Sequence, residues 1–125
     1  MKLLIVDDSL IVRNAIQRCA MRGEITEIFQ AQDGQEAIEL FLLHQPELVT
    51  MDLTMPRVDG LGCLEKLREI NAEASILVIS ALNSHATAMQ AISLGACGFV
   101  VKPFTAAELS EALEDLISHA AGVLD

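Results

Sequence analysis

The sequence predicts an α/β fold, a doubly wound parallel sheet of five strands with five helices on its two faces. Five short apolar runs, each bounded by polar or turn residues, alternate along the chain with segments whose apolar residues recur at helical spacing. Neighbouring parallel strands need a crossover connection, which a helix usually supplies. No repeat or linker interrupts the alternation, and 125 residues suit one domain, so residues 1–125 are expected to form a single unit.

The expected strands are the apolar runs themselves. The first contains four aliphatic residues in succession, LLIV at 3–6, which is typical of a buried strand. In chain order the runs are KLLIV at 2–6, EITEIFQ at 24–30, ELVTM at 47–51, SILVIS at 75–80 and CGFVV at 97–101.

Helical spacing marks the segments between and after the strands. The first four helices are indicated by Val12, Ala15, Ile16, Cys19 and Ala20; by Ala37, Leu40 and Phe41; by Cys63, Leu64 and Leu67; and by Ala88, Met89 and Ile92. Asp33 with Glu36 marks one helix start, and Thr105 with Glu108 forms the capping-box pattern of another. The last helix then carries one apolar stripe, made of Leu109, Ala112, Leu113, Leu116, Ile117 and Ala120.

Composition and charge exclude several classes of function. Aromatic residues make up only 3% of the chain, so it offers no platform on which bases could stack. The formal net charge of −10 repels phosphate backbones and anionic lipid, so nucleic-acid binding is not expected. The first apolar run is too short for a signal-peptide core, and no stretch approaches a membrane span. We therefore expect a cytoplasmic protein with no membrane insertion.

The cysteines are predicted to be packing residues. Cys19, Cys63 and Cys97 are odd in number, far apart and placed among apolar residues. Neither a disulfide framework nor a metal site has that pattern. All three are therefore expected to be reduced and to contribute to packing.

Polar residues stand where the predicted strands end. Asp7 and Asp8 follow the first strand, Asp52 the third, Ser80 closes the fourth and Lys102 follows the fifth. In open parallel sheets, ligands bind beyond the carboxyl ends of the strands. If the first and third strands are neighbours, three carboxylates converge, and their mutual repulsion calls for a cation. Oxygen ligands of this kind suit Mg²⁺.

The remaining two side chains extend this interpretation to phosphate. An ammonium group beside a metal ion adds repulsion unless an anion lies between them. A phosphoryl group would satisfy Lys102, Ser80 and the metal together, with one carboxylate attacking phosphorus. The sequence therefore predicts a magnesium-dependent phosphoryl site.

Each of these residues also has an ordinary structural interpretation. Asp8 or Ser9 could cap the first helix, and Asp52 could belong to a strand-end turn. Ser80 could be a satisfied core hydroxyl and Lys102 a surface charge. Their joint occurrence at four of the five predicted strand ends favours the site.

Several motifs resemble those of the receiver domains of two-component response regulators, most closely the single-domain chemotaxis type. They are LLIVDDS, PELVTMDLTMPRVDG, the Ser80-Ala81 pair after ILVI, and GACGFVVKPF, in the order and spacing of that family. The resemblance covers essentially the whole chain. It implies a flavodoxin-like fold with strand order 2-1-3-4-5.

The resemblance also implies a role for each site residue. Asp52 would accept a phosphoryl group from a sensor histidine kinase, and Lys102 would contact that group. The metal ligands would be Asp7, partly through water, Asp8, Asp52 and the backbone carbonyl of Thr54. Ser80 and Phe99 would form the switch, and the Lys102-Pro103 bond would be cis.

Two departures from common relatives bear on the activity. Phe99 stands where many relatives have tyrosine, so no phenolic hydroxyl can bind a partner there. Thr54 and Leu82 flank the phosphate position and offer neither an amide nor a carboxylate to orient water. Slow self-dephosphorylation is therefore expected.

The implied function is a signalling switch without an output domain, which catalyses only its own phosphorylation and dephosphorylation. Its partner would be a flagellar motor switch protein or a phosphotransfer protein, so a phosphorelay role stays open. A monomer is expected, and a dimer through the fourth and fifth helices stays open. A small phosphatase of the haloacid-dehalogenase class is disfavoured, since it needs a general acid where Thr54 stands. No G-x-G-x-x-G motif follows the first strand, which excludes a dinucleotide site.

Overall fold

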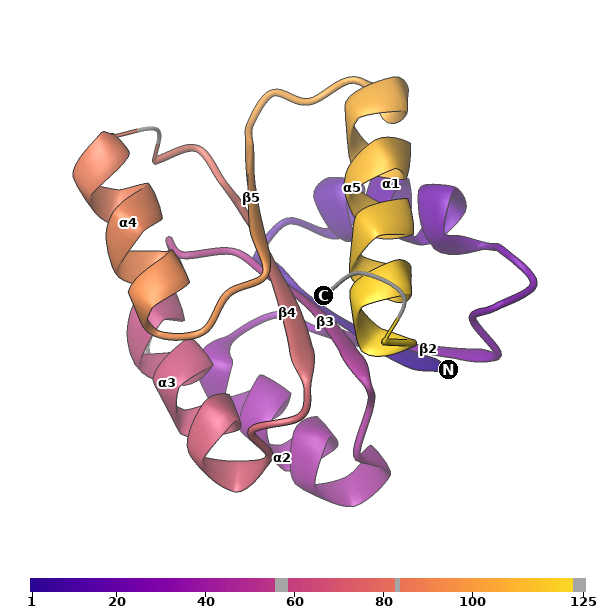
Figure 1. Cartoon of the computed structure of the whole chain (residues 1–125), viewed down its shortest axis with the longest axis horizontal. Helices are drawn as coiled ribbons and strands as arrows, with labels where there is room; N and C mark the ends of the chain where they lie inside the picture. Colours follow the sequence, from indigo (N-terminus) through magenta and orange to yellow (C-terminus); the bar gives the residue numbers. More distant parts are fainter. Residues whose placement is uncertain (56–58, 83, 123–125) are drawn as a thin grey trace.

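The computed structural model describes residues 1–55, 59–82 and 84–122 (Figure 1). Strands and helices alternate through the chain, as the sequence predicts. The elements are β1 (Lys2–Val6), α1 (Leu10–Ala20), β2 (Glu27–Ala31), α2 (Gly34–His44), β3 (Leu48–Met51), α3 (Gly60–Ile70), β4 (Ser75–Ser80), α4 (His85–Ser93), β5 (Gly98–Val101) and α5 (Ala106–Ala120). Residues 56–58, which belong to the PELVTMDLTMPRVDG motif, lie outside the described residues.

The five strands form one parallel sheet in the order β2-β1-β3-β4-β5, which confirms the predicted fold class and strand order. β1 lies between β2 and β3, with Leu4 opposite both Phe29 and Val49. The chain therefore winds outward first to one side of β1 and then to the other. That reversal places the ends of β1 and β3 beside each other at the crevice where ligands bind in such sheets.

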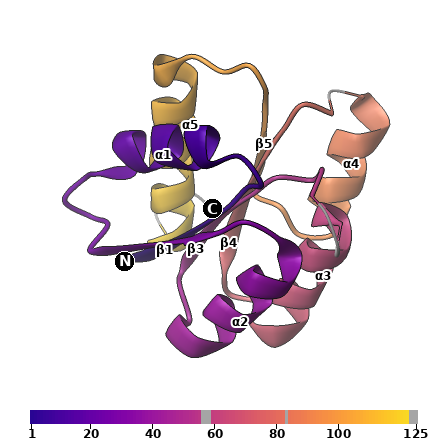
Figure 2. The ribbon, with the colours of Figure 1, turned by 180° about the vertical axis from the view of Figure 1, so that it is seen from behind.

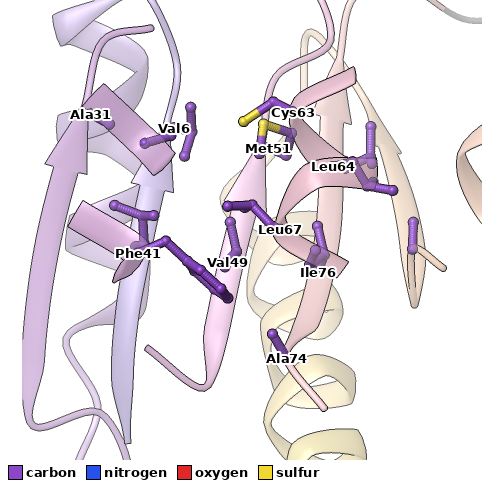
Figure 3. Close-up of a cluster of buried hydrophobic side chains, with 14 of the residues drawn as sticks. Val6, Ala31, Phe41, Val49, Met51, Cys63, Leu64, Leu67, Ala74 and Ile76 are labelled. Atoms are coloured by element: carbon purple, nitrogen blue, oxygen red, sulfur yellow. The ribbon is translucent and has the colours of Figure 1, made fainter. Parts of the chain in front are cut away.

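Helices cover both faces of the sheet. Figures 1 and 2 show α1 and α5 on one face and α2, α3 and α4 on the other. Alternate strand residues point to opposite faces, so Leu3 and Ile5 pack under α1 and α5 while Leu4 and Val6 pack with α2 and α3. Figure 3 shows the second of these cores, where Phe41 and Leu67 meet Val49 of β3. β3 and β4 are buried along their whole length.

Every helix begins at a residue whose side chain accepts a hydrogen bond from the first turn. These N-caps are Ser9, Asp33, Asp59, Ser84 and Thr105. The two predicted starts are confirmed, and Thr105 with Glu108 forms the reciprocal capping box. Ser9 rather than Asp8 caps α1, which leaves the carboxylate of Asp8 out of the capping role.

Two element predictions need correction. The second strand begins at Glu27, not at residue 24, because residues 22–24 form a turn in which the Ile25 N–H donates to the carbonyl of Arg22 at 3.1 Å. On α4 the predicted apolar stripe does not face the core. Ala91 is the buried residue of that helix, while Met89 and Ile92 are about half exposed, at 55% and 46%.

The three cysteines lie in different surroundings, so the prediction that all three pack in apolar regions is wrong for one of them. Cys63 lies on α3 and is fully buried, and Cys19 lies on α1 and is half-buried. Cys97 is exposed just before β5, which is the edge strand of the sheet. Among the described residues, no helix is both long and apolar enough to cross a membrane.

Candidate functional site

The three predicted carboxylates meet at the carboxyl ends of β1 and β3. Carboxylate oxygens of Asp7, Asp8 and Asp52 all lie within 4.8 Å of one another. Asp7 and Asp52 are buried, at 1% and 3% exposed, whereas Asp8 is exposed and faces water. The cluster therefore has a closed inner side and an open outer side, through which an ion and a ligand can enter.

Backbone hydrogen bonds hold the two loops that carry these carboxylates. The Asp7 N–H donates to the carbonyl of Ala31 at 3.1 Å, and the Asp52 N–H donates to the carbonyl of Val6 at 2.9 Å. These bonds continue the strand ladders by one residue beyond β1 and β3. The sheet thus fixes the backbone from which the side chains of Asp7 and Asp52 extend.

Lys102 reaches into the acidic cluster from the end of β5. Its Nζ lies 2.7 Å from Oδ2 of Asp7 and 3.6 Å from Oδ1 of Asp52. The Lys102-Pro103 peptide bond is cis, as predicted. The Lys102 N–H donates to the carbonyl of Ser80 at 2.8 Å, so β4 and β5 end side by side. The ammonium group thereby provides part of the positive charge that three carboxylates need.

Ser80 and Phe99 occupy the neighbouring strands. Ser80 is fully buried at the end of β4, and its Oγ accepts a hydrogen bond from the Leu82 N–H at 3.1 Å. That bond uses an acceptor site of the hydroxyl and leaves its hydrogen for another partner. Phe99 is partly buried in β5, opposite Val78, and packs against the core under α3 and α4.

The pKa of Asp52 is raised from its ordinary value of 3.8 to about 6. Burial is the main cause, because it disfavours the charged form, and the negative charge of Asp7 adds to it. The ammonium group of Lys102 and the Thr54 N–H, which donates to Oδ1 of Asp52 at 3.3 Å, act in the opposite direction. Asp52 is therefore ionised at neutral pH, but its charge is only partly compensated.

The donor set fits a hard divalent cation. It consists of carboxylate oxygens, two of them buried and repelling one another, with an open side for water. Neither a thiol nor an imidazole belongs to this group of residues. Mg²⁺ prefers such oxygen ligands and keeps several waters.

Two supporting residues were missed by the sequence analysis. The guanidinium group of Arg13 donates to the carbonyl of Asp7 at 2.7 Å and to Oε1 of Gln30 at 3.0 Å, so it holds the acidic loop against α1 and β2. The sequence gives little sign of this role, because Arg13 contacts a backbone carbonyl and a glutamine side chain rather than a carboxylate. Its place in the first turns of α1, close after Asp7, was the available signal.

Gly60 is the second supporting residue. It begins α3 so close to the loop after β3 that a Cβ there would collide with the backbone of Asp52 and Leu53. The Gly60 N–H also donates to the carbonyl of Leu53 at 3.1 Å. The start of α3 therefore rests directly on the backbone of Asp52.

Comparison with known proteins agrees with this geometry. The family model of the response regulator receiver domain matches residues 3–114. The chemotaxis protein CheY of Bacillus subtilis is 36% identical over 117 residues, which cover 94% of this chain and 98% of that protein. CheY of Thermotoga maritima is 35% identical over 90% of this chain and 93% of its own length.

Solved structures also have a closely similar fold. A chain of the CheX-CheY-BeF3-Mg²⁺ complex from Borrelia burgdorferi aligns with a TM-score of 0.88 at 30% identity, covering 93% of this chain and 88% of that one. The receiver domain of NtrX from Brucella abortus aligns with a TM-score of 0.85 at 29% identity, over 94% of this chain and 98% of that one. With its acidic cluster, lysine and strand order, this chain belongs to the family of response regulator receiver domains.

Proposed function

We propose that this protein is a single-domain response regulator that is phosphorylated on Asp52 and thereby changes its affinity for a partner in chemotaxis. The observation that supports this most directly is the placement of Lys102 against Asp7 and Asp52 within a cluster of three carboxylates. A structural ion pair would need one carboxylate. Three carboxylates and one lysine leave a surplus of negative charge suited to a metal ion.

The metal site would be formed by Asp7, Asp8, Asp52 and the backbone carbonyl of Thr54. These oxygens would hold Mg²⁺, which when bound supplies positive charge beside the phosphoryl oxygens. Exposed Asp8 lies on the open side of the cluster and would be the ligand nearest to solvent.

Phosphoryl transfer would use Asp52 as the nucleophile. An oxygen of its carboxylate attacks phosphorus of a phosphohistidine on the kinase, a bond from that oxygen to phosphorus forms, and the bond from phosphorus to the imidazole nitrogen breaks. The imidazole leaves with the electron pair of the broken bond. The carboxylate must be ionised for this step, and a bound Mg²⁺ would favour its ionised form.

Lys102 and Ser80 would recognise the phosphoryl group. The ammonium group of Lys102 exchanges its 2.7 Å contact with Asp7 for a contact with a phosphoryl oxygen. Ser80 donates its hydroxyl hydrogen, which its bond with the Leu82 N–H leaves free. Movement of Ser80 toward the phosphate would let Phe99 turn further inward, and this pair would carry the signal to α4 and β5.

The partner would bind after this change. Chemotaxis is the favoured process because the CheY relatives of Bacillus subtilis and Thermotoga maritima match nearly from end to end. The Borrelia relative is described in complex with CheX, BeF3 and Mg²⁺. By analogy, partners of this chain would include a sensor histidine kinase and a motor switch protein or CheX-like protein. A phosphorelay role is distinguished by transfer of the phosphoryl group from Asp52 to a histidine phosphotransfer protein.

The first experiment is intact-mass spectrometry after incubation with acetyl phosphate. With Mg²⁺, the protein should gain one phosphoryl group, and the gain should disappear in Asp52→Asn and on addition of EDTA. Asp115→Asn, on the surface of α5, removes a carboxylate outside the site and should be phosphorylated as the unchanged protein is. Modification of Asp52→Asn, or of the unchanged protein in EDTA to the same extent, would contradict the proposal.

A further inference from the structure

The three cysteines differ in access and in neighbours. Cys63 is fully buried, and burial raises the pKa of its thiol to about 12, so it stays protonated and out of reach of reagents. Cys19 is half-buried on α1 and packs against the core. Cys97 is the exposed one. Access alone therefore selects Cys97 as the residue that a dissolved reagent meets first.

Cys97 lies against a histidine that is 22 residues away in the sequence. Its Sγ is 3.4 Å from Nδ1 and 3.8 Å from Nε2 of His119, in the last turn of α5. The thiol has one hydrogen and can bond only one ring nitrogen, and Nδ1 is the nearer of the two. An imidazole in this position can take the thiol proton and leave the thiolate, which is the reactive form.

His119 is itself held in place by a buried residue. Oγ of Ser75, which is 1% exposed, lies 3.1 Å from Nδ1 of His119. A hydroxyl can donate or accept, so Ser75 can bond to this nitrogen whether or not it carries a proton. The ring therefore keeps its place beside Cys97 through a proton transfer.

The pair borders two surface cavities that can receive a small adduct. One, of about 420 Å³, is lined by Leu77, Phe99 and Leu116 together with Asp115, Cys97 and His119. The other, of about 460 Å³, is lined by the same pair together with Arg68 and Glu73. Each is many times the volume of about 30 Å³ that one water occupies in the liquid.

We propose that Cys97 is a thiol modification site that accepts a small thiol from a low-molecular-weight disulfide. His119 takes the proton from Sγ, and the thiolate attacks one sulfur of the disulfide. A bond forms between Sγ of Cys97 and that sulfur, the original disulfide bond breaks, and the leaving thiolate receives the proton from His119. The products are a mixed disulfide on Cys97 and one free small thiol.

This site lies at the opposite end of the sheet from the acidic cluster. Cys97 precedes β5 and its N–H donates to the carbonyl of Ile76 near the start of β4, whereas Lys102 follows β5. Neither Asp52 nor a metal ion takes part in the thiol reaction. Failure of one proposal therefore leaves the other unaffected.

The test uses the full chain and cystamine, whose ammonium groups suit a protein with a net charge of −10. The folded, reduced protein is incubated at pH 7 in EDTA, and intact mass and peptide mapping follow the adduct. We expect one cysteamine adduct on Cys97, no adduct in Cys97→Ser, and an unchanged rate in the control variant Cys19→Ser. Reaction of Cys19 as fast as Cys97 would overturn the proposal.

The role of His119 has its own readout. His119→Gln should react roughly ten-fold or more slowly at pH 7, because it lacks the base. At high pH the two rates should converge, since hydroxide in solution can then replace the imidazole as the base. Equal rates at pH 7, or a gap that persists at high pH, would show that the imidazole does not activate Cys97.

Discussion

The two helices that follow the site differ in how they are attached to the sheet. α5 spans 15 residues, has a complete capping box and buries Leu109, Leu113, Leu116 and Ile117. α4 spans nine residues and buries only Ala91, while Met89 and Ile92 face solvent. Burial of large apolar side chains is the main source of helix stability in proteins. α5 is therefore firmly attached to the sheet, and the position of α4 costs less to change than that of α5.

Both helices are connected to the acidic cluster. Ser80 ends β4 shortly before α4 begins, and Lys102 follows β5 shortly before α5 begins. The proposed phosphorylation of Asp52 would therefore act close to both helices, and of the two, α4 can move without exposing a large apolar face. Weakly attached elements are the ones that proteins use for switching.

The largest expected effect comes from weakening the packing of α5. Leu113→Ala on α5 should lower the free energy of unfolding by about 2–5 kcal/mol, because Leu113 is fully buried and its loss leaves a cavity. The matched control is Met89→Ala on α4, which should change it by about 0.5 kcal/mol or less. Urea unfolding followed by circular dichroism measures both. Equal losses would contradict the difference between the helices.

A second prediction concerns the charge of Asp52, which lies in the acidic cluster near the starts of both helices. Because its pKa is about 6 in the fold against an ordinary 3.8, the folded protein holds the proton more tightly. The stability that this provides is fully present below pH 3.8 and is lost as the pH rises through about 6. In EDTA, Asp52→Asn should be more stable than the unchanged protein at pH 8, by at most about 3 kcal/mol.

The sign of that effect is tested by its pH dependence. The advantage of Asp52→Asn should shrink as the pH falls below about 6 and approach zero near pH 4. Urea unfolding at several pH values gives the comparison. An advantage that is the same at pH 4.5 and pH 8 would mean that titration of Asp52 is not its source.

The third prediction enlarges the single buried residue of α4. Ala91 is fully buried, so Ala91→Leu should overpack the contact between α4 and the sheet at a cost of about 1–3 kcal/mol. Native-state hydrogen exchange should show faster exchange in α4 while the amides of α5 keep their protection. Loss of protection throughout the chain would show that α4 is not an independent unit.

The smallest expected effect is in the N-caps. Thr105→Ala removes the acceptor for the Glu108 N–H and should cost about 1 kcal/mol in global unfolding. Ser84→Ala removes the equivalent acceptor for the Thr87 N–H on α4. Its effect should appear mainly as faster exchange of α4 amides, because that helix can open alone. Equal global losses would argue against this difference.

Much of this architecture could be predicted from local sequence patterns. Strand and helix order follows from periodicity, and the capping box at Thr105 and Glu108 from a spacing of three residues. The site residues could be identified because parallel strands end at one edge, which brings Asp7, Asp52 and Lys102 together. The assignment of a role to each of them came from the resemblance to the receiver family.

What could not be predicted depends on tertiary neighbours. The buried face of α4 is set by the sheet edge it meets, and there small Ala91 fits while Met89 and Ile92 do not. The contact of Arg13 with the carbonyl of Asp7 involves a backbone atom, which no side-chain pattern marks. The pair of Cys97 and His119 forms only when α5 packs beside β5.

Gly60 gives the molecule a point from which reactivity could be tuned without touching a reacting group. Any larger residue there must push away the stretch of main chain on which Asp52 stands. Gly60→Ala would therefore change the position and direction of the Asp52 carboxylate and leave the chemical group itself unchanged. For protein engineering, substitution of the first residue of α3 is therefore a way to alter the geometry of the site without replacing any of its side chains.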